Sequence, residues 1–585
     1  MRTHTCGELR KKDVTKTVVL EGWAQSRRDH GGVIFIDLRD RYGMSQVVFD
    51  PSHNNTIHKT AEHIGREFVL HVKGKVRDRK EGMINPKMPT GEVEVIVDEL
   101  EILNESETPP MEIDDRILPN EELRLKYRYI DLRRPSMQEK IILRHNVVQA
   151  TREFLNSKGF LEIETPLLVK PTPEGARDYV VPSRVNPGMM YALPQSPQLY
   201  KQILMVSGFD RYYQVARCLR DEDLRADRQP EFTQIDIEMS FPTQEMIFEV
   251  IEEMMKHIFK KTKNIDLKTP FERLTYHDSM QRFGCNKPDL RFGLEITDVT
   301  EIANKSEFSV FKNAIAKGGV VRCLCVSNDF SRNKMDELIE FVKQNKAQGM
   351  AWAKVQDNKL ESSIVKYLNE SIQKEIIHKT KAKKGDMLMF VADKPKIACS
   401  ALSALRNFLG KELKLYKEDE FKFAWVVDFP LFEFNDETEK LEPAHHMFTM
   451  PNKETLKYLE TAPEKVIAEC YDLVLNGLEL ASGSIRIHRK DIQERVMKAM
   501  GISHEEAEKK FGFLLEAFKF GAPPHGGIAP GLDRLCALMT GTNDIREVIA
   551  FPKNKAAQCP MDNSPAEVSD KELKEVHLKW NIVKK

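Results

Sequence analysis

Short segments of alternating apolar and polar residues, separated by turn signals, fill the first hundred positions of the chain. They cover residues 17–23, 33–38, 46–49, 67–76 and 92–103. The turns between them contain Gly31, Gly32, Gly43, Gly82 and Gly91. Period-two alternation in segments of this length predicts strands with one buried face. Five such strands with little helix predict a small closed barrel of the OB type, a fold that presents one face to single-stranded nucleic acid.

The same alternation predicts which barrel side chains face outward. Ile34 and Ile36 share the core side of their strand, which places Phe35 on the other side. The remaining outward side chains are predicted to be Gln46, Glu92 and Glu94, with Arg28 just upstream. An aromatic ring, an amide, carboxylates and an arginine on one face suit contacts with nucleotides. The alternative is an ordinary solvated face with one exposed phenylalanine.

The pattern changes after the predicted barrel. Residues 106–119 are rich in Pro, Glu and Asp, which indicates a hinge, and apolar residues at helical spacing over 137–158 predict a long amphipathic helix that ends at Gly159. Strands and helices then alternate to about residue 284 and again from about 421. Between these stretches lie Lys-rich helical segments with two strand candidates, 320–326 and 387–391.

These changes predict a multidomain α+β protein. The expected parts are a barrel domain (1–105), a hinge (106–134), a core in two pieces (135–284 and 421–560), an inserted α/β domain (285–420) and a C-terminal extension (561–585). Several domains also follow from length, because 585 residues exceed the ~250 at which a single core stops growing.

Charge and cysteine usage exclude some classes of protein. The formal net charge of −1 leaves nucleic acid open as a partner, because binding depends on where Lys and Arg cluster. Nine scattered cysteines indicate reduced thiols and a cytoplasmic location. No stretch approaches the ~20 apolar residues of a membrane span, so membrane insertion is not expected.

Three segments carry candidate chemistry. The first, 159–168, is a predicted strand that follows the long helix and ends at a proline. The second is a strand, a charged loop and a returning strand over 218–236, in which Arg220 and Arg228 repel each other unless they face solvent or a polyanion. The third, 525–534, places small residues at the start of a helix, where Arg534 can reach a phosphate or a flat base. The glycine patterns of the common nucleotide-binding folds do not occur.

Taken in this order, the three segments resemble motifs 1, 2 and 3 of the class II aminoacyl-tRNA synthetases. The N-terminal barrel, the string 195–201 before motif 2 and the insertion between motifs 2 and 3 resemble the aspartyl members of bacterial type, and residues 349–352 resemble part of their GAD domain. The resemblance implies an antiparallel-sheet catalytic domain that activates L-aspartate with ATP and transfers it to tRNA(Asp). It also implies a homodimer formed through motif 1.

The resemblance assigns the ATP site to motifs 2 and 3. Arg220 would bridge the α-phosphate and the substrate carboxylate, Arg228 would hold the γ-phosphate, and Arg534 would pack on adenine near the phosphate tail. Phe232 would stack on the other face of the base and Glu222 would read its amino group. Further implied members of the ATP site are Gln229, Glu479, Gly531, Leu532 and Asp533. The implied catalytic residues are Arg220, Glu479 and Arg534.

The implied aspartate site combines fixed cations with acceptors for the ammonium group. Arg486 and Lys201 would bind the side-chain carboxylate, helped by His445 or His446 and oriented by Asp236. Its remaining members are Glu174, Ser196 and Gln198 for the ammonium group, together with Arg220 and Gln234. Placing the amide of asparagine against Arg486 would leave a buried charge unpaired, at a cost of roughly 3 to 5 kcal/mol.

A magnesium site is predicted at a hairpin. Asp472 and Glu479 flank Asn476-Gly477, a turn that can bring both carboxylates toward one phosphate. Without the resemblance, which assigns both to Mg²⁺, they would be ordinary surface carboxylates. The neighbouring histidines, 445 and 446, are not expected to bind metal because they lack a partner at ligand spacing.

On the tRNA side, the resemblance turns the barrel face into an anticodon reader. Phe35 would stack on the central U, Gln46 and Arg28 would contact anticodon bases, and Glu92 or Glu94 would accept from one of them. His30 and Gly82 resemble the residues of relaxed enzymes that also charge tRNA(Asn). One departure is Pro530, which stands where motif 3 usually has a bulky apolar residue and removes one backbone donor.

Two alternatives stay open from the sequence. An asparaginyl or lysyl synthetase would share the motifs but is separated by the combination Gln198, Lys201 and Arg486. A synthetase-like tRNA-binding or regulatory protein would lack activation chemistry, and the intact set of charged residues in motifs 2 and 3 argues against it.

Overall fold

The computed structural model describes residues 1–172, 176–435 and 440–581. The chain forms two compact units. One comprises residues 1–141, 550–554 and 558–565, and the other comprises 142–549, 555–557 and 566–585.

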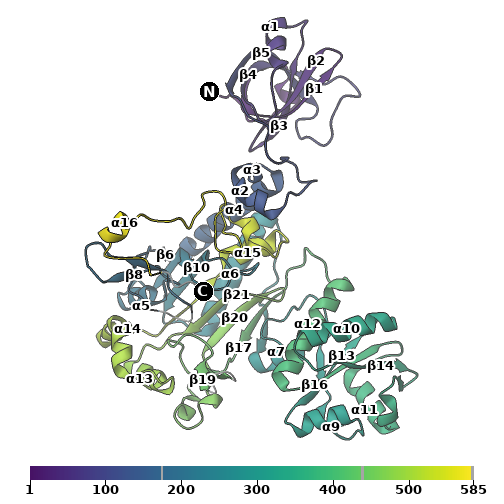
Figure 1. Cartoon of the computed structure of the whole chain (residues 1–585), viewed down its shortest axis with the longest axis vertical. Coiled ribbons are helices and arrows are strands. Elements are labelled where there is room, and N and C mark those ends of the chain that lie inside the picture. The colour runs from purple at the N-terminus through teal and green to yellow at the C-terminus, as the bar shows by residue number, and fades with distance from the viewer. Residues whose placement is uncertain (173–175, 436–439, 582–585) are drawn as a thin grey trace. The chain divides into compact units, whose positions relative to one another are not determined.

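The first unit contains the predicted closed barrel (Figure 1). Its strand order is β1 (Thr17–His30), β2 (Val33–Asp40), β3 (Gly43–Phe49), β5 (Val93–Asn104) and β4 (Val69–Asp78). A short helix, α1 (Asn55–Ala61), lies between β3 and β4 in the sequence. Strand β1 is longer than predicted because it pairs with β4 over residues 17–23 and then with β2 up to His30. The alternating apolar side chains form one buried core, which confirms the OB-type barrel.

Short helices connect the barrel to the rest of the chain. They are η1 (Lys11–Asp13) before β1, and α2 (Glu121–Lys126) and α3 (Arg128–Asp131) after β5. Asp131 is fully buried and accepts hydrogen bonds from Arg124, Arg128 and Arg134. The predicted long helix is α4 (Pro135–Ser157), which ends before Gly159 as expected.

The centre of the second unit is a sheet of eight strands. Its order is β11 (Glu272–Thr275), β17 (Phe423–Val427), β20 (Cys470–Leu475), β21 (Leu478–Ile485), β22 (His525–Pro530), β10 (Glu231–Ser240), β9 (Arg211–Leu219) and β6 (Leu161–Glu162). All neighbours are antiparallel except β11 with β17 and β6 with β9, which are parallel. Motif 2 is therefore the pair β9 and β10, as predicted, and motif 3 is β22 followed by α15 (Leu532–Met539).

Helices cover one face of this sheet, and polar residues gather on the other. Helices α4, α6 (Gln244–Lys263) and α15 contribute to the main core, where Phe248 stacks on the buried Trp425 at 4.2 Å between ring centroids. Along β10, Ile235 and Ile237 point into this core. The alternate residues of β10 are Phe232, Gln234, Asp236 and Glu238. Strand periodicity therefore places this polar row on the open face of the sheet.

The insertion folds as a second, five-stranded sheet flanked by helices (Figure 1). The strand order is β12 (Ile296–Asp298), β13 (Val320–Val326), β16 (Met387–Asp393), β14 (Ala351–Gln356) and β15 (Lys359–Glu361). Its helices are α8 (Thr300–Asn304), α9 (Ser309–Ala316), α10 (Arg332–Gln344), η2 (Val365–Tyr367), α11 (Glu370–Thr380) and α12 (Pro395–Glu412), and α7 (Tyr276–Phe283) precedes them. The two predicted strands are β13 and β16, whereas the other three strands were not predicted.

Smaller elements complete the second unit. They are β7 (Val180–Pro182), β8 (Met190–Ala192), α5 (Gln198–Val206), β18 (Phe432–Asn435), β19 (Lys440–Pro443), η3 (Leu456–Tyr458), η4 (Pro463–Lys465), α13 (Lys490–Ala499), α14 (His504–Ala517), η5 (Phe518–Phe520), η6 (Ile545–Val548) and α16 (Asp570–Glu575). None of the helices in the described ranges is long and apolar enough to cross a membrane.

Candidate active site

One cavity of about 330 Å³ on the open face of the large sheet brings together residues from motif 2, from motif 3 and from the segment that follows β21. Arg220 from motif 2, Arg486 beyond β21 and Arg534 from motif 3 all line it. The other predicted residues in its lining are Ser196, Gln198, Lys201, Glu222, Arg228, Gln229, Phe232, Gln234, Asp236, His446, Glu479, Gly531 and Asp533. Segments far apart in the sequence therefore meet in a single space.

Four charged side chains are buried side by side at one end of the cavity. Lys201 on α5 lies 2.7 Å from Asp236 Oδ1 and 3.2 Å from Glu238 Oε2. Arg486 donates from Nε and Nη2 to the two oxygens of Glu238 at 3.0 and 3.2 Å. Each of the four is at most 2% exposed. We call Lys201, Asp236, Glu238 and Arg486 the four-charge cluster.

Burial and pairing act against each other on the two carboxylates of the cluster. Burial alone would raise the pKa of Glu238, but Arg486 and Lys201 outweigh burial and lower it. Burial does raise the pKa of Asp236, although Lys201 opposes the shift. Within the described structure, Asp236 Oδ2 has no hydrogen-bond partner. The cluster therefore offers fixed cations and an unused acceptor to a small charged molecule.

His446, not His445, joins this cluster. Arg486 donates from Nη1 to His446 Nε2 at 2.5 Å and to Ser484 Oγ at 2.7 Å. Burial, followed by the charge of Arg486, lowers the pKa of His446 well below its usual value, so the ring is neutral and can accept. His445 instead packs edge-on against Phe429, with ring centroids 4.9 Å apart.

The residues predicted to hold an ammonium group lie near the same end. Ser196 accepts from the backbone N–H of Gln198 at 3.4 Å. The side-chain nitrogen of Gln198 is buried, and no acceptor for it is present in the described parts of the chain. Gln234 accepts a contact from the Cys218 thiol at 3.3 Å. Glu174 lies outside the described residues.

At the other end of the cavity, arginines and carboxylates hold one another in half-exposed pairs. Arg228 donates to Glu222 at 2.9 Å. Arg534 donates to the backbone oxygen of Glu479 at 2.8 Å and to Asp227 at 3.3 Å. We call this the phosphate end, because two partly exposed arginines beside each other match the requirements of a polyphosphate.

Arg220 and Phe232 stack on each other in this region. The guanidinium of Arg220 lies 5.0 Å from the centre of the Phe232 ring. Its Nε is buried and has no acceptor among the residues that the structure describes. A buried donor without a partner costs free energy, so Arg220 is poised to bind an anion or a carbonyl.

Contacts with β10 and α4 hold the start of the motif 3 helix in place. Asp533 accepts from the backbone N–H of Thr233 at 2.7 Å and pairs with Arg144 of α4. Gly531 begins α15 and bridges to Gln234, while Leu532 is buried in the core and is absent from the described cavity lining. Pro530 does not disturb the strand: the pairing of β22 with β10 covers His525–Ile528 and ends before Pro530, which stays in register with Ala481 of β21. The Asp533 side chain therefore holds the start of α15 against β10 and α4, in addition to lining the cavity.

The two carboxylates predicted for magnesium lie on neighbouring strands. Strands β20 and β21 form the predicted hairpin, and both turn residues, Asn476 and Gly477, have positive φ (52° and 83°) as such a turn requires. Burial and the neighbouring Glu479 raise the pKa of Asp472 to about 7. Burial would raise the pKa of Glu479 too, but Lys287 and Arg534 lower it.

This pair fits a magnesium ion shared with phosphates. Asp472 Oδ1 is buried and is left without a hydrogen-bond partner in the described chain. No group of three or more possible metal-binding side chains occurs among the described residues. Mg²⁺ is usually held by one or two carboxylates together with substrate phosphates, so two carboxylates beside the phosphate end suffice.

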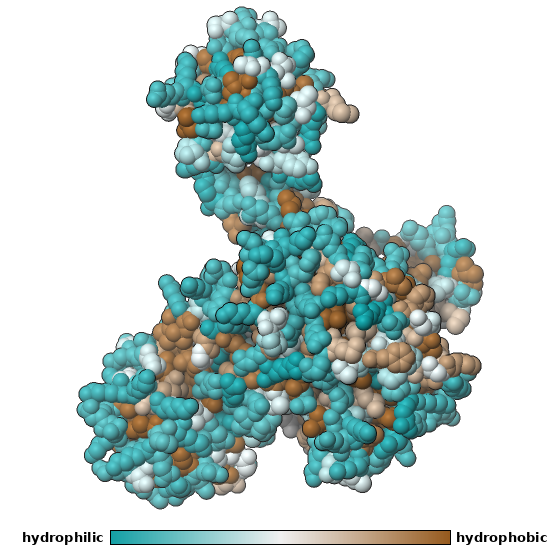
Figure 2. All heavy atoms as spheres, turned by 180° about the vertical axis from the view of Figure 1, so that it is seen from behind, coloured by the Kyte–Doolittle hydropathy of each residue, from teal (hydrophilic) through white to brown (hydrophobic). Residues whose placement is uncertain are grey.

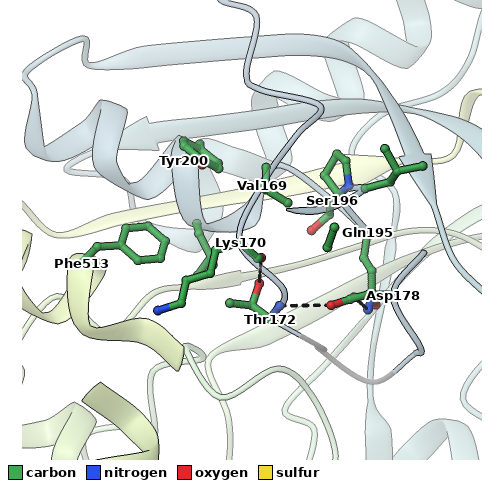
Figure 3. A pocket seen from close by; sticks show the side chains of 12 residues that line it. Val169, Lys170, Thr172, Asp178, Gln195, Ser196, Tyr200 and Phe513 are labelled. Carbon is green, nitrogen blue, oxygen red and sulfur yellow. Dashed lines mark hydrogen bonds between the residues drawn. The ribbon is translucent and has the colours of Figure 1, made fainter. Parts of the chain in front are cut away.

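A second pocket of about 160 Å³ adjoins the first through Ser196 (Figure 3). Val169, Tyr200 and Phe513 give it apolar walls. Its lysine, Lys170, donates to the backbone oxygen of Lys509, and Asp178 accepts from the backbone N–H of Thr172 at 3.1 Å. These polar groups are thus already paired.

On the barrel, the predicted nucleotide-contacting residues form a connected row. Arg28 donates to Asp37 at 2.9 Å and to Gln46 at 3.1 Å, and Gln46 donates to Glu94 at 2.8 Å. Phe35 is half-buried and lies opposite Arg28 on the neighbouring strand.

The two glutamates left open by the sequence have different surroundings. Glu94 belongs to this row and is only 8% exposed. Glu92 is exposed and pairs with Lys11 at 3.2 Å. His30 and Gly82 are both exposed, the first at the end of β1 and the second after β4.

Two residues of the site escaped the sequence analysis: Glu238, the buried partner of Lys201 and Arg486, and Lys287. Glu238 continues the alternation of Phe232, Gln234 and Asp236, so strand periodicity could have found it. Lys287, at the start of the insertion, lies 2.8 Å from Glu479 and lines the same cavity. Its only sequence signal is a lysine before a proline, which does not predict a site.

Family models match both parts of the chain. One described as tRNA synthetases class II (D, K and N) matches residues 120–555. One described as OB-fold nucleic acid binding domain matches residues 18–103, the region of the barrel.

Curated relatives match from end to end. A protein of Caldanaerobacter subterraneus subsp. tengcongensis named aspartate–tRNA(Asp/Asn) ligase is 54% identical over 99% of this chain and 98% of its own length. One of Treponema denticola with the same name is 55% identical over 99% and 98%. A Bacillus licheniformis protein named aspartate–tRNA ligase is 52% identical, again over 99% and 98%.

Solved structures agree on the fold. Asparaginyl-tRNA synthetase from Pyrococcus horikoshii, complexed with asparaginyl-adenylate, is similar with a TM-score of 0.59 and 19% identity over 94% of this chain and 97% of its own. Aspartyl-tRNA synthetase from Entamoeba histolytica has a TM-score of 0.57 and 19% identity over 94% and 91%. A family model over most of the chain and relatives more than half identical throughout lead to one conclusion: the chain belongs to the class II tRNA synthetases of the D, K and N group.

Proposed function

We propose that this chain activates L-aspartate with ATP and transfers it to tRNA, as an aspartate–tRNA ligase of the cytoplasm. The observation that carries the proposal is the four-charge cluster, which shares one cavity with the phosphate end. The names of the relatives support the same activity. The nine cysteines, all free in the structure, fit a reducing compartment.

Activation needs positioning and charge stabilisation more than a protein nucleophile. An α-carboxylate oxygen of aspartate attacks the α-phosphorus of ATP, the bond to the bridging oxygen of the β-phosphate breaks, and pyrophosphate leaves. Arg220 would bind the reacting carboxylate and the α-phosphate together, a role that its unpartnered buried Nε supports. Arg228 would exchange its present carboxylate partner for the γ-phosphate, and Arg534 would leave Asp227 to pack on adenine near the phosphate tail.

Selectivity for aspartate would come from the four-charge cluster. Arg486 and Lys201 can each add a contact to a substrate carboxylate while they keep Glu238 and Asp236 as partners. A neutral amide in that position would leave part of this buried charge uncompensated, which supports aspartate over asparagine and lysine.

Asp472 and Glu479 would hold Mg²⁺ with the ATP phosphates. The ion, when bound, supplies positive charge that stabilises the leaving pyrophosphate. The unpartnered buried oxygen of Asp472 supports this role, because coordination would satisfy it.

Transfer completes the reaction on tRNA. A terminal hydroxyl of the tRNA attacks the aspartyl carbonyl carbon, and AMP leaves. The barrel row of Arg28, Phe35, Gln46 and Glu94 would read the anticodon through stacking and hydrogen bonds. Of the two glutamates left open by the sequence, we favour Glu94 because it bonds to Gln46.

We further propose that both tRNA(Asp) and tRNA(Asn) are charged. His30 and Gly82 support this selectivity, since both are exposed near the barrel face. Relatives named for both tRNAs support it too.

A homodimer through motif 1 is part of the proposal. Large apolar side chains are exposed on and near the edge strand β6 and on β7 and β8: Leu161, Leu167, Leu168, Val180 and Tyr191. Exposed apolar side chains of this kind are typical of surfaces that are covered in an assembly. Figure 2 shows that hydrophobic side chains reach the surface on the face drawn there.

The deciding experiment is exchange of labelled pyrophosphate into ATP, measured with aspartate, asparagine and lysine. We expect exchange with aspartate alone. Aminoacylation of purified tRNA(Asp) and tRNA(Asn) then follows, with Phe35→Ala as a variant that keeps exchange and loses charging. Exchange that depends equally on asparagine would refute aspartate selectivity, and no charging of tRNA(Asn) would refute the dual tRNA specificity.

A further inference from the structure

The lysine that begins the insertion lies at the phosphate end of the cavity. Lys287 Nζ is 2.8 Å from Glu479 Oε2, and the Lys287 side chain is 43% exposed. The residue lines the same cavity as Arg220, Arg228 and Arg534. It therefore stands beside the place where the outer phosphates of ATP would lie under the proposed function.

Lys287 shares the arrangement of the two neighbouring arginines. Arg228 holds Glu222 and Arg534 holds Asp227, and in each pair both side chains are partly exposed. Lys287 with Glu479 repeats this pattern, with the carboxylate 28% exposed. Such pairs are weak in solvent and can be exchanged for a stronger anion. Three exchangeable cations around one cavity, Arg228, Lys287 and Arg534, suit the roughly three to four negative charges of a nucleoside triphosphate.

Residues of the insertion hold the segment that carries Lys287 in place. Arg406 of α12 is buried and donates from Nη2 to the backbone oxygens of Asp289 and Phe292 at 2.6 and 3.0 Å. Arg291 binds the carboxylate of Asp289 and lies 3.7 Å from the centre of the Tyr416 ring. The short segment that carries Lys287 is thus attached to the insertion by several hydrogen bonds.

The same segment packs against the hairpin of β20 and β21, which carries Asp472 and Glu479. A Cβ added to Gly477, in the turn between β20 and β21, would lie 3.2 Å from the Cβ of Asp289. On the other side of the turn, Asn476 donates to the backbone oxygen of Glu420, where the insertion returns to the core. Both connections of the insertion therefore meet the turn that separates Asp472 from Glu479.

We propose that Lys287 is a further ATP-binding residue, and that the insertion places its ammonium on the β- and γ-phosphates. On binding of ATP with Mg²⁺, the ammonium leaves Glu479 for a phosphate oxygen, and Glu479 becomes available as a metal ligand. This inference rests on the proposed function for the identity of the nucleotide. It gives the insertion a direct part in the site.

The test is calorimetric binding of ATP and of AMP, both with Mg²⁺, to the full-length chain. Lys287→Met should weaken ATP binding about tenfold, the loss of one charge-assisted hydrogen bond, and leave AMP binding within about twofold. Lys287→Arg should keep most of the ATP affinity. The matched control is Lys422→Met, since Lys422 lies in the returning connection, pairs with Glu420 at 3.8 Å and does not belong to the described lining of the cavity.

Two outcomes would overturn the proposal. Equal ATP affinities for the wild type and Lys287→Met would show that the ammonium does not bind phosphate. Equal losses of ATP and AMP affinity would show that the lysine only supports the shape of the site. If the wild type bound ATP but showed no exchange with aspartate, the proposed function would fail, while the ATP to AMP ratio would still decide the role of Lys287.

Discussion

The two ends of the cavity are built from the same residue types in different ways. In the four-charge cluster each residue is at most 2% exposed, and Arg486 donates two hydrogen bonds to the carboxylate of Glu238. At the phosphate end the cations Arg228, Lys287 and Arg534 are 28 to 43% exposed, and their carboxylate partners are partly exposed as well. One end is a rigid part of the core, and the other is a set of replaceable pairs.

The difference matches the two kinds of ligand. A small amino acid offers few contacts, so selectivity requires groups that are fixed before it arrives. A triphosphate carries enough charge to displace weak pairs, and half-exposed cations lose little when they change partner. Substitutions at the cluster should therefore damage both folding and selectivity, whereas substitutions at the phosphate end should change nucleotide binding alone.

Arg486→Leu should give the largest effect. Removing one partner leaves Glu238 buried and unpaired, which costs about 3 to 5 kcal/mol of stability, and aspartate-dependent exchange should fall by at least about a thousandfold. Binding of ATP should persist. The measurements are exchange, ATP calorimetry and thermal unfolding.

Arg489→Leu is the matched control, because Arg489 pairs with Asp491 at the surface, where both side chains are about 60% exposed. It should leave all three measurements nearly unchanged. Retained aspartate activation in Arg486→Leu would contradict the role of the cluster.

Asp472→Asn should change how the free energy of unfolding depends on pH. The folded-state pKa of Asp472, about 7, lies above its ordinary value of 3.8, so the folded chain binds this proton more tightly than the unfolded chain. The contribution to stability is therefore complete below about pH 4 and is lost as pH rises to about 7. In metal-free buffer the variant should gain about 3 kcal/mol over the wild type between pH 4.5 and pH 8. If the difference in the free energy of unfolding between the two proteins were the same at both pH values, the pKa of Asp472 would not be raised.

Arg228→Ala should change nucleotide binding without a loss of stability. Its pair with Glu222 is 39% and 26% exposed, so the pair contributes about 1 kcal/mol or less to folding. The KM for ATP should rise about tenfold, and the KM for aspartate should stay within about twofold. A thermal midpoint lowered as much as in Arg486→Leu would contradict the contrast between the two ends.

Ionic strength should give the smallest effect. Raising salt from about 0.05 to about 0.5 M screens half-exposed charges more than buried ones, so the KM for ATP should rise about threefold and the KM for aspartate should barely change. Steady-state exchange over this range measures both constants. An equal response of the two constants would show that the buried cluster is no better shielded.

Much of the fold follows from local patterns. The barrel strands alternate because each has one buried face, and the hairpin of β20 and β21 follows from Asn476-Gly477. Strands β12 and β15 were missed because each has three residues, too few to show a period. Strand β14 carries Lys354 and Gln356 among small and apolar residues, so its alternation is weak.

The site was predictable where residues share a strand or a motif. Asp236 and Arg534 came from the family resemblance, and strand periodicity adds Glu238. Pairings between distant segments could not be derived, because Lys287 meets Glu479 through the packing of the insertion against a turn. The mutual pairing of Glu222 with Arg228 is likewise a property of the folded loop.

The free cysteines provide the chain with a natural attachment point for a fluorophore. Seven of the nine are buried, and only Cys285 and Cys325 are partly exposed. Burial and Asp386 raise the pKa of the Cys325 thiol to about 12, which keeps it from forming a reactive thiolate. Cys285 lies two positions before Lys287. A thiol-reactive dye on the unaltered chain would therefore report from beside the cavity, and nucleotide occupancy could be followed by light emission without engineering a label.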